Sequence, residues 1–183
     1  MKIRNGYVSN SSSSSFVVIQ NSGPYQKKYD TCWETVTVPS NDCGCAQFWW
    51  QFEEYYDFWS KLNWCAICIN DMRELERNEN SEDRMKRAIK FPWLESKAME
   101  KMLKKVCKEK LGLDINVVET DHHTSIDHQS AVYEKPENAR MFQTDIKLYD
   151  FLANADSYIS CGNDNEDAPN GPRLYRKDYS ECA

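Results

Sequence analysis

Aromatic side chains crowd one short segment of this 183-residue chain, and that segment limits how the chain can fold. Nine of the seventeen residues from Phe48 to Trp64 are Phe, Trp or Tyr. Apolar residues recur at helical spacing within it, which predicts a helix over residues 46–62. A helix that is apolar around so much of its circumference either lies at the centre of a core or forms half of an interface.

One helix in a domain of this size cannot easily hide so many rings. Core packing remains the ordinary fate of most buried aromatics. Trp and Tyr are also the residues that dominate interface hot spots, and a contiguous exposed patch of them marks a protein contact. The predicted binding residues in this segment are Trp49, Trp50, Tyr56 and Trp59.

Short strand-like and helix-like patterns are intermixed along the rest of the chain. Strands are predicted over residues 16–19, 33–38, 113–119 and 157–161. Residues 64–69 form an apolar run that fits either a buried strand or the start of a further helix. The most regular amphipathic helix runs from Met99 to Leu111, with lysines on its other face and Gly112 as its C-cap residue.

These patterns predict a single α+β domain over residues 1–183. It combines a small mixed or antiparallel sheet with an aromatic-rich central helix and a basic amphipathic helix. A Ser-rich arm is expected over residues 1–20 and a peripheral tail over residues 169–183. The polar run at residues 78–83 is expected to be a flexible loop, and Thr144 is expected to cap a helix.

The charge is unevenly distributed, although the net value is only −6. The stretch from Arg84 to Lys110 contains ten Lys or Arg and three acids. The stretch from Asp114 to Asp167 contains twelve acids and three Lys or Arg. Either the two stretches neutralise each other or the basic one binds an anionic partner; the first is favoured because charged helix faces are usually just solvated. The acidic balance makes a nucleic-acid partner unlikely on physical grounds, and no run approaches the length of a membrane span.

Six of the seven residues from Ser9 to Ser15 are Ser. Such a tract is ordinarily a linker, but its hydroxyl and N–H groups can also cradle an anion or bond to a partner's edge strand. Ser11, Ser12, Ser13, Ser14 and Ser15 are therefore predicted binding residues. The run RNGYVSNSSSSSF, from Arg4 to Phe16, resembles an N-terminal signature of uncharacterised proteins from tailed bacteriophages. That resemblance implies a phage-encoded protein in the bacterial host cytoplasm or in the virion.

Eight cysteines could suggest disulfides, but the N-terminal segment lacks the apolar core of a secretory signal, so we expect reduced thiols. Two cysteine pairs offer four thiolates, enough for a tetrahedral zinc site. The candidate zinc ligands are Cys43, Cys45, Cys65 and Cys68. The competing interpretation is that Cys65 and Cys68, three residues apart in an apolar segment, simply pack in the core.

All three histidines lie close together after the strand predicted at residues 113–119. With nearby carboxylates they suit Zn, Mn or Fe. The run from Val117 to His123 is similar to the Asp-His-His motif of the DHH phosphoesterases, although no Asp-x-Asp element precedes it. That resemblance implies metal-dependent phosphodiester cleavage, with Asp121, His122 and His123 as the candidate ligands, and the histidine cluster adds His128 as a further candidate. A solvated turn of His and Asp is the competing interpretation.

Taken together, these features favour a phage accessory or virion-associated protein that binds a phage virion component or a host protein and needs no cofactor. The metal-dependent phosphoesterase is the alternative. An inhibitor that mimics nucleic acid is a third class, for which the charge of −6 is too dilute.

Overall fold

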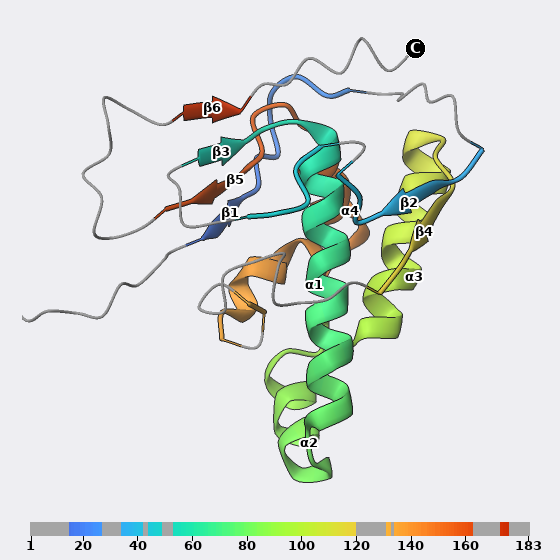
Figure 1. The fold of residues 1–183 in the computed structure, drawn as a ribbon, viewed down its shortest axis with the longest axis vertical. Helices are drawn as coiled ribbons and strands as arrows, with labels where there is room; N and C mark the ends of the chain where they lie inside the picture. The colour runs from blue at the N-terminus through green and yellow to red at the C-terminus, as the bar shows by residue number, and fades with distance from the viewer. Residues whose placement is uncertain are drawn as a thin grey trace, which may run out of the picture.

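A long helix, α1 (Phe58–Asn78), runs through the centre of the computed structural model (Figure 1). The structure describes residues 15–26, 34–41, 44–48, 53–119, 131–132 and 134–162, and the backbone of residues 173–175. The predicted α+β class is confirmed, because helices and two small sheets surround α1 in one domain.

The strands are short and form two separate sheets. They are β1 (Phe16–Val18), β2 (Val36–Val38), β3 (Glu53–Tyr55), β4 (Ile115–Val117), β5 (Tyr158–Cys161) and β6 (Arg173–Tyr175). The larger sheet has the order β1-β5-β3-β6, with β5 antiparallel to both neighbours and β6 parallel to β3. The smaller sheet is the parallel pair β2-β4.

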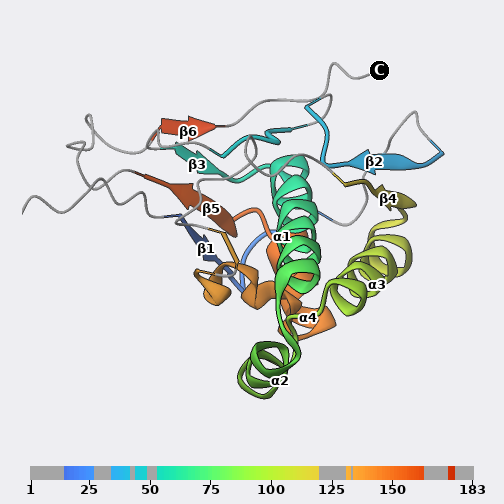
Figure 2. The same cartoon turned by 60° about the horizontal axis from the view of Figure 1, so that its bottom comes forward.

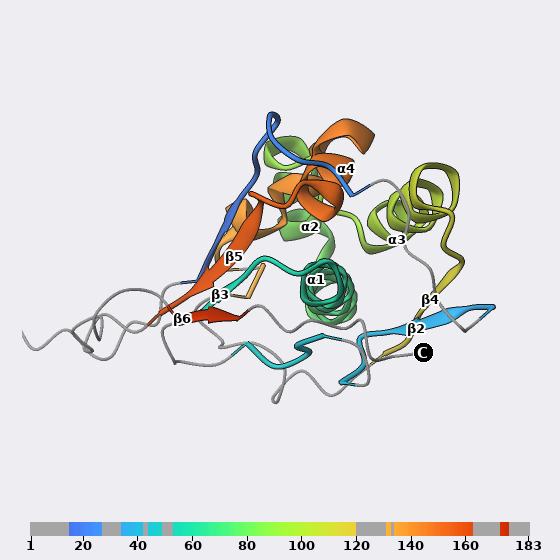
Figure 3. The ribbon, with the colours of Figure 1, turned by 90° about the horizontal axis from the view of Figure 1, so that it is seen from above.

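Helices make up most of the remaining described chain. They are α2 (Ser81–Lys90), α3 (Ser96–Val106), the π-helical turn η1 (Cys107–Leu111), the 3-10 segment η4 (Pro136–Gln143) and α4 (Asp145–Ala153). Viewed down α1, the four-stranded sheet lies on one side and α3 with the β2-β4 pair on the other (Figure 3). This arrangement surrounds α1 on most of its circumference.

The first two thirds of α1 are buried on every side. The carboxylate of Asp57 accepts a hydrogen bond from the Ser60 N–H at 2.8 Å and so caps the N-terminus of the helix. Every residue from Ser60 to Met72 is buried, which is the pattern of a helix inside a core rather than on a surface. Only the last turns, from Arg73 onward, emerge toward solvent.

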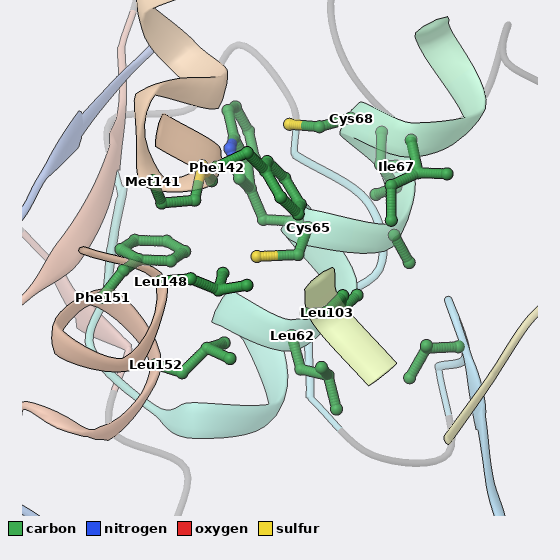
Figure 4. Close-up of a cluster of buried hydrophobic side chains, with 14 of the residues drawn as sticks. Leu62, Cys65, Ile67, Cys68, Leu103, Met141, Phe142, Leu148, Phe151 and Leu152 are labelled. Atoms are coloured by element: carbon green, nitrogen blue, oxygen red, sulfur yellow. The ribbon is translucent and has the colours of Figure 1, made fainter. Parts of the chain in front are cut away.

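Figure 4 shows how the core forms around α1. Side chains of α1 meet η4 and α4 on one side and Leu103 of α3 on another. The labelled core residues are Leu62, Cys65, Ile67, Cys68, Leu103, Met141, Phe142, Leu148, Phe151 and Leu152. All ten are at most 1% exposed.

The helix predicted over residues 46–62 is wrong in its boundaries. Of that range the structure describes residues 44–48 and 53 onward; the chain is extended at Phe48, and Glu53–Tyr55 is strand β3. The rings of Phe48 and Tyr55 lie 5.0 Å apart, whereas seven residues of helix would separate them by about 10 Å along the axis. The helical spacing was therefore coincidental, and the helix begins only after the cap at Asp57.

Several other local predictions are confirmed. The strands expected near residues 16–19, 33–38, 113–119 and 157–161 are β1, β2, β4 and β5. Residues 64–69 belong to α1, the helical of the two alternatives. The amphipathic helix is α3 with η1, and Gly112 ends it in the left-handed region at φ 73°. The Thr144 hydroxyl accepts the Lys147 N–H at 3.1 Å and caps α4.

Three boundaries differ from the sequence predictions. Within the arm predicted over residues 1–20, the described residues 15–20 include β1, which pairs with β5 and so belongs to the sheet. Residues 78–83 are not one loop, because α2 begins at Ser81. In the predicted tail over residues 169–183, the described backbone is β6, at the edge of the four-stranded sheet.

Candidate interaction surface

Local sequence signals favour the helix α2. The Asn80 side chain accepts hydrogen bonds from the N–H groups of Glu82 and Asp83, both at 3.0 Å. Two acids in the first turn and two bases in the last turn match the helix dipole. Lys86 and Glu82 add an ion pair of 2.7 Å one turn apart.

No residue of α2 is buried. Met85 is 66% exposed and Ile89 is 78% exposed, and their spacing places them on one face of the helix. We call Met85 and Ile89 the α2 stripe. Figure 2 shows α2 standing clear of the sheets, below the end of α1. An apolar helix face with no core to cover it is a typical feature of a contact surface.

A network of charged contacts holds α2 against the end of α1 and the turn that follows α2. The Arg87 guanidinium bonds Glu79 at 2.8 Å, with only 12% and 7% of the two side chains exposed, and also donates to the Leu94 carbonyl oxygen. Glu76, 4.0 Å from Arg87, accepts hydrogen bonds from the N–H and hydroxyl of Ser96. Because this network is largely sheltered from water, it can fix α2 without any apolar packing from the helix itself.

A cavity of about 380 Å³ lies between α2, the C-terminal half of α1 and the turn after α2. Its walls are mainly apolar, and its lining also includes three cations of α2. Arg87 lies roughly opposite the α2 stripe, and Lys90 lies about 100° around the helix from Ile89. Lys86 is at the border of the stripe, about 60° from Ile89.

The large apolar side chains that are exposed lie outside the aromatic segment. Within the described residues they are Phe16, Met85, Ile89 and Ile146. Phe48, Tyr55, Phe58 and Trp64 of the aromatic segment are instead at most 5% exposed. The sequence feature that would have predicted the start of α2 is Asn80 followed three residues later by Asp83, which is a capping pattern at the start of a helix.

The predicted aromatic binding residues have different surroundings. Tyr56 is half-buried; its ring stacks on Tyr158 with centroids 4.8 Å apart, and its hydroxyl donates to Glu54 at 2.9 Å. Trp59 is half-buried and packs edge-on against Phe58 at the margin of the core. Trp49 and Trp50 lie outside the described residues.

Of the serine tract, Ser15 is described and is 4% exposed. Its hydroxyl bonds the Cys161 thiol on the inner side of the sheet. Ser11, Ser12, Ser13 and Ser14 lie outside the described residues, so their predicted binding role remains a prediction.

The described cysteines of the predicted zinc site occupy two environments. Cys45 is beside the first turn of α1, where its N–H donates to the Ser60 hydroxyl at 2.8 Å and its thiol to the Gln47 carbonyl at 2.7 Å. Cys65 and Cys68 are fully buried, and burial raises the pKa of both thiols well above the ordinary value. Cys43 lies outside the described residues. Among the residues that are described, no three His, Cys, Asp or Glu side chains gather as a metal site would require.

The candidate residues of the phosphoesterase loop are not among those the structure describes. They are Asp121, His122, His123 and His128. The described chain stops just before them at Glu119, whose carboxylate pairs with Arg77 at 3.3 Å. The metal-dependent alternative therefore stays a prediction.

The two oppositely charged stretches do make contact. Lys105 pairs with Asp145 at 2.5 Å and Lys108 with Asp114 at 2.9 Å, all four side chains being at least 40% exposed. Such exposed pairs contribute little stability each. They agree with the interpretation in which the basic and acidic stretches neutralise each other, and they leave the cations of α2 outside that arrangement.

Within the part of the chain that the structure describes, no helix combines the length and apolar character needed to cross a membrane. No protein-family model, curated protein or solved structure matches this chain.

Proposed function

We propose that this chain is a phage-encoded accessory or virion-associated protein that acts by binding another protein and catalyses no reaction. Its partner is a virion component or a host protein, in the host cytoplasm or in the virion. The resemblance of the run from Arg4 to Phe16 to tailed-phage proteins supports the phage origin.

The observation that carries the proposal is the α2 stripe. Met85 and Ile89 present apolar surface on a helix that buries none of its residues. Removing such surface from water is favourable, so a partner that covers the stripe gains binding free energy. The Arg87–Glu79 contact holds the helix in place and limits the ordering entropy that binding would cost.

The chemistry of the described thiols supports a non-catalytic role. Burial raises the pKa of the Cys161 and Cys107 thiols to about 12. A thiolate is the reactive form of cysteine, so these groups are protonated and unreactive at neutral pH.

Quantitative co-purification tests the proposal. The tagged chain and a Met85→Gln/Ile89→Gln variant are recovered from cells infected with the phage that encodes the chain, and purified virions are analysed by mass spectrometry. Gln is a good helix former, so the double variant removes apolar surface while leaving α2 intact. We expect a specific partner with the wild-type chain and at least tenfold less of it with the double variant.

Ile146→Gln is the matched control, because Ile146 is 73% exposed on α4, away from α2. This variant should recover the partner as well as the wild-type chain does. A partner recovered equally by all three proteins, or the absence of any specific partner together with absence from virions, would contradict the proposal.

A further inference from the structure

The cavity beneath α2 has the size and lining of a small-molecule site. Its volume, about 380 Å³, falls within the range of ordinary ligand pockets. Apolar side chains supply most of its wall: Met72, Leu75, Phe91, Leu94, Val132 and Pro136. A wall of this composition favours the apolar body of a ligand over water.

The charged residues of the lining carry a net positive charge. Among the described residues of the lining Glu79 is the one acid, and the Arg87 guanidinium already neutralises it at 2.8 Å. Lys86 also has acidic partners, Glu82 and Asp83, but in exposed pairs that contribute little.

Lys90 is the cation available to a ligand. It has no ion pair with any residue that the structure describes, and its ammonium lies 5.0 Å from the centroid of the Phe91 ring, which itself lines the cavity. A positive charge therefore sits directly beside an apolar opening. This pairing discriminates between ligands, because an anionic head would be attracted and a cationic head repelled.

We propose that this cavity binds an anionic amphiphile, a medium-chain alkyl carboxylate, with the alkyl chain against the Leu75–Leu94 wall and the carboxylate at Lys90. Polar groups at the rim fix the orientation, while the apolar wall provides the favourable transfer from water. Lys90, which holds the carboxylate, lies about 100° around α2 from Ile89, so the site stands independently of the proposed protein contact.

Isothermal titration calorimetry of the 183-residue chain with decanoate tests the site. We expect saturable binding of one decanoate per chain, and markedly weaker binding of decyltrimethylammonium, which has the same alkyl chain and the opposite charge. Lys90→Glu should weaken decanoate binding about tenfold, since it removes a charge-assisted contact and adds repulsion. Lys97→Glu is the matched control, because Lys97 is exposed on α3 and is not among the lining residues, and this variant should bind as the wild type does.

Three results would overturn the proposal. These are no saturable decanoate binding, equal affinity for the two amphiphiles, and unchanged affinity in Lys90→Glu. Sedimentation velocity on the same samples provides the remaining check. If the chain self-associates without ligand and decanoate dissociates it, the cavity belongs to an interface between copies and the small-molecule site is wrong.

Discussion

The ammonium of Lys61 donates a hydrogen bond to the main-chain carbonyl of Asn154 at 2.8 Å, joining residues that are 93 positions apart in the sequence. A second bond, of 3.2 Å, reaches the carbonyl of Ser157. Lys61 is 1% exposed, and burial lowers its pKa to about 8. The central helix is thus tied to the turn between α4 and β5 by a lysine in the core.

Replacing Lys61 by Met should destabilise the fold. Met retains most of the aliphatic stem, but two buried carbonyls lose their donor and nearby Asp57 loses its compensating charge. The expected loss in the free energy of unfolding is about 3 kcal/mol. Urea denaturation measures it. Lys108→Met removes an exposed ion pair with Asp114 and should cost under about 1 kcal/mol; equal losses in the two variants would contradict the structural role of Lys61.

Stability should fall above pH 9. The pKa of Cys107 and of Cys161 is raised from 9.0 to about 12, so the stability from keeping these thiols protonated is present below pH 9 and is lost as pH rises toward 12. Cys65 and Cys68 shift in the same direction. Lys61 opposes them: its folded pKa of about 8 lies below the ordinary 10.5, so it adds stability as pH rises between those values.

Four buried thiols outweigh one amine, so the net slope above pH 9 is negative. Urea denaturation between pH 7 and 11, with a reductant present, measures this dependence. Cys107→Ala should flatten the decline by up to about 1.4 kcal/mol per pH unit, the value for one proton. A slope that is identical in this variant and the wild type would mean that Cys107 does not titrate as its burial implies.

The difference between α3 and α1 shows what the sequence could predict. In α3, Met99 and Leu103 face the core and lysines face water, so the period of the pattern is visible. In α1, polar residues such as Asn63 and Asn70 interrupt the buried stretch. They are tolerated because their amides bond the carbonyls of Ser40, Cys45 and Val118, distant partners that no local pattern records.

The candidate surface likewise has one part that the sequence could predict and one part that it could not. The cap of α2 is local, and Asn80 with Asp83 could have identified it from the sequence. The cavity could not have been identified, because it brings Leu75 of α1 and Phe91 together with Val132 and Pro136, which lie about forty or more positions further along the chain. Only the packed fold creates that juxtaposition.

The cap of α1 should contribute measurably to stability. Asp57 accepts the Ser60 N–H at 2.8 Å, while its other carboxylate oxygen is buried without a hydrogen-bond partner among the described residues. Asp57→Ala and Asp57→Ser both remove the charge beside Lys61, but only Ser can still cap. We expect the Ala variant to be less stable than the Ser variant by about 1 kcal/mol in urea denaturation. Equal stability of the two would show that the cap is energetically silent.

The cysteine pairs should not hold zinc. Cys45 lies at the level of Ser60, and Cys68 is eight residues further along α1, or about 12 Å at 1.5 Å per residue. Two thiolates on one zinc lie within about 4.6 Å of each other, because each is about 2.3 Å from the ion. We therefore expect elemental analysis to find no zinc bound at these cysteines. The metal content of the purified chain should be the same in Cys45→Ala as in the wild type.

The same measurement separates the two metal hypotheses. One zinc per chain that disappears in Cys45→Ala would show that the thiols converge despite the separation seen along α1. A stoichiometric metal that survives Cys45→Ala but is lost in a His122→Ala/His123→Ala variant would instead place it in the histidine loop, since imidazoles are the remaining strong ligands. In that case, phosphodiester hydrolysis by the metal-loaded protein becomes the activity to measure, and the non-catalytic function proposed above would have to be withdrawn if turnover is found.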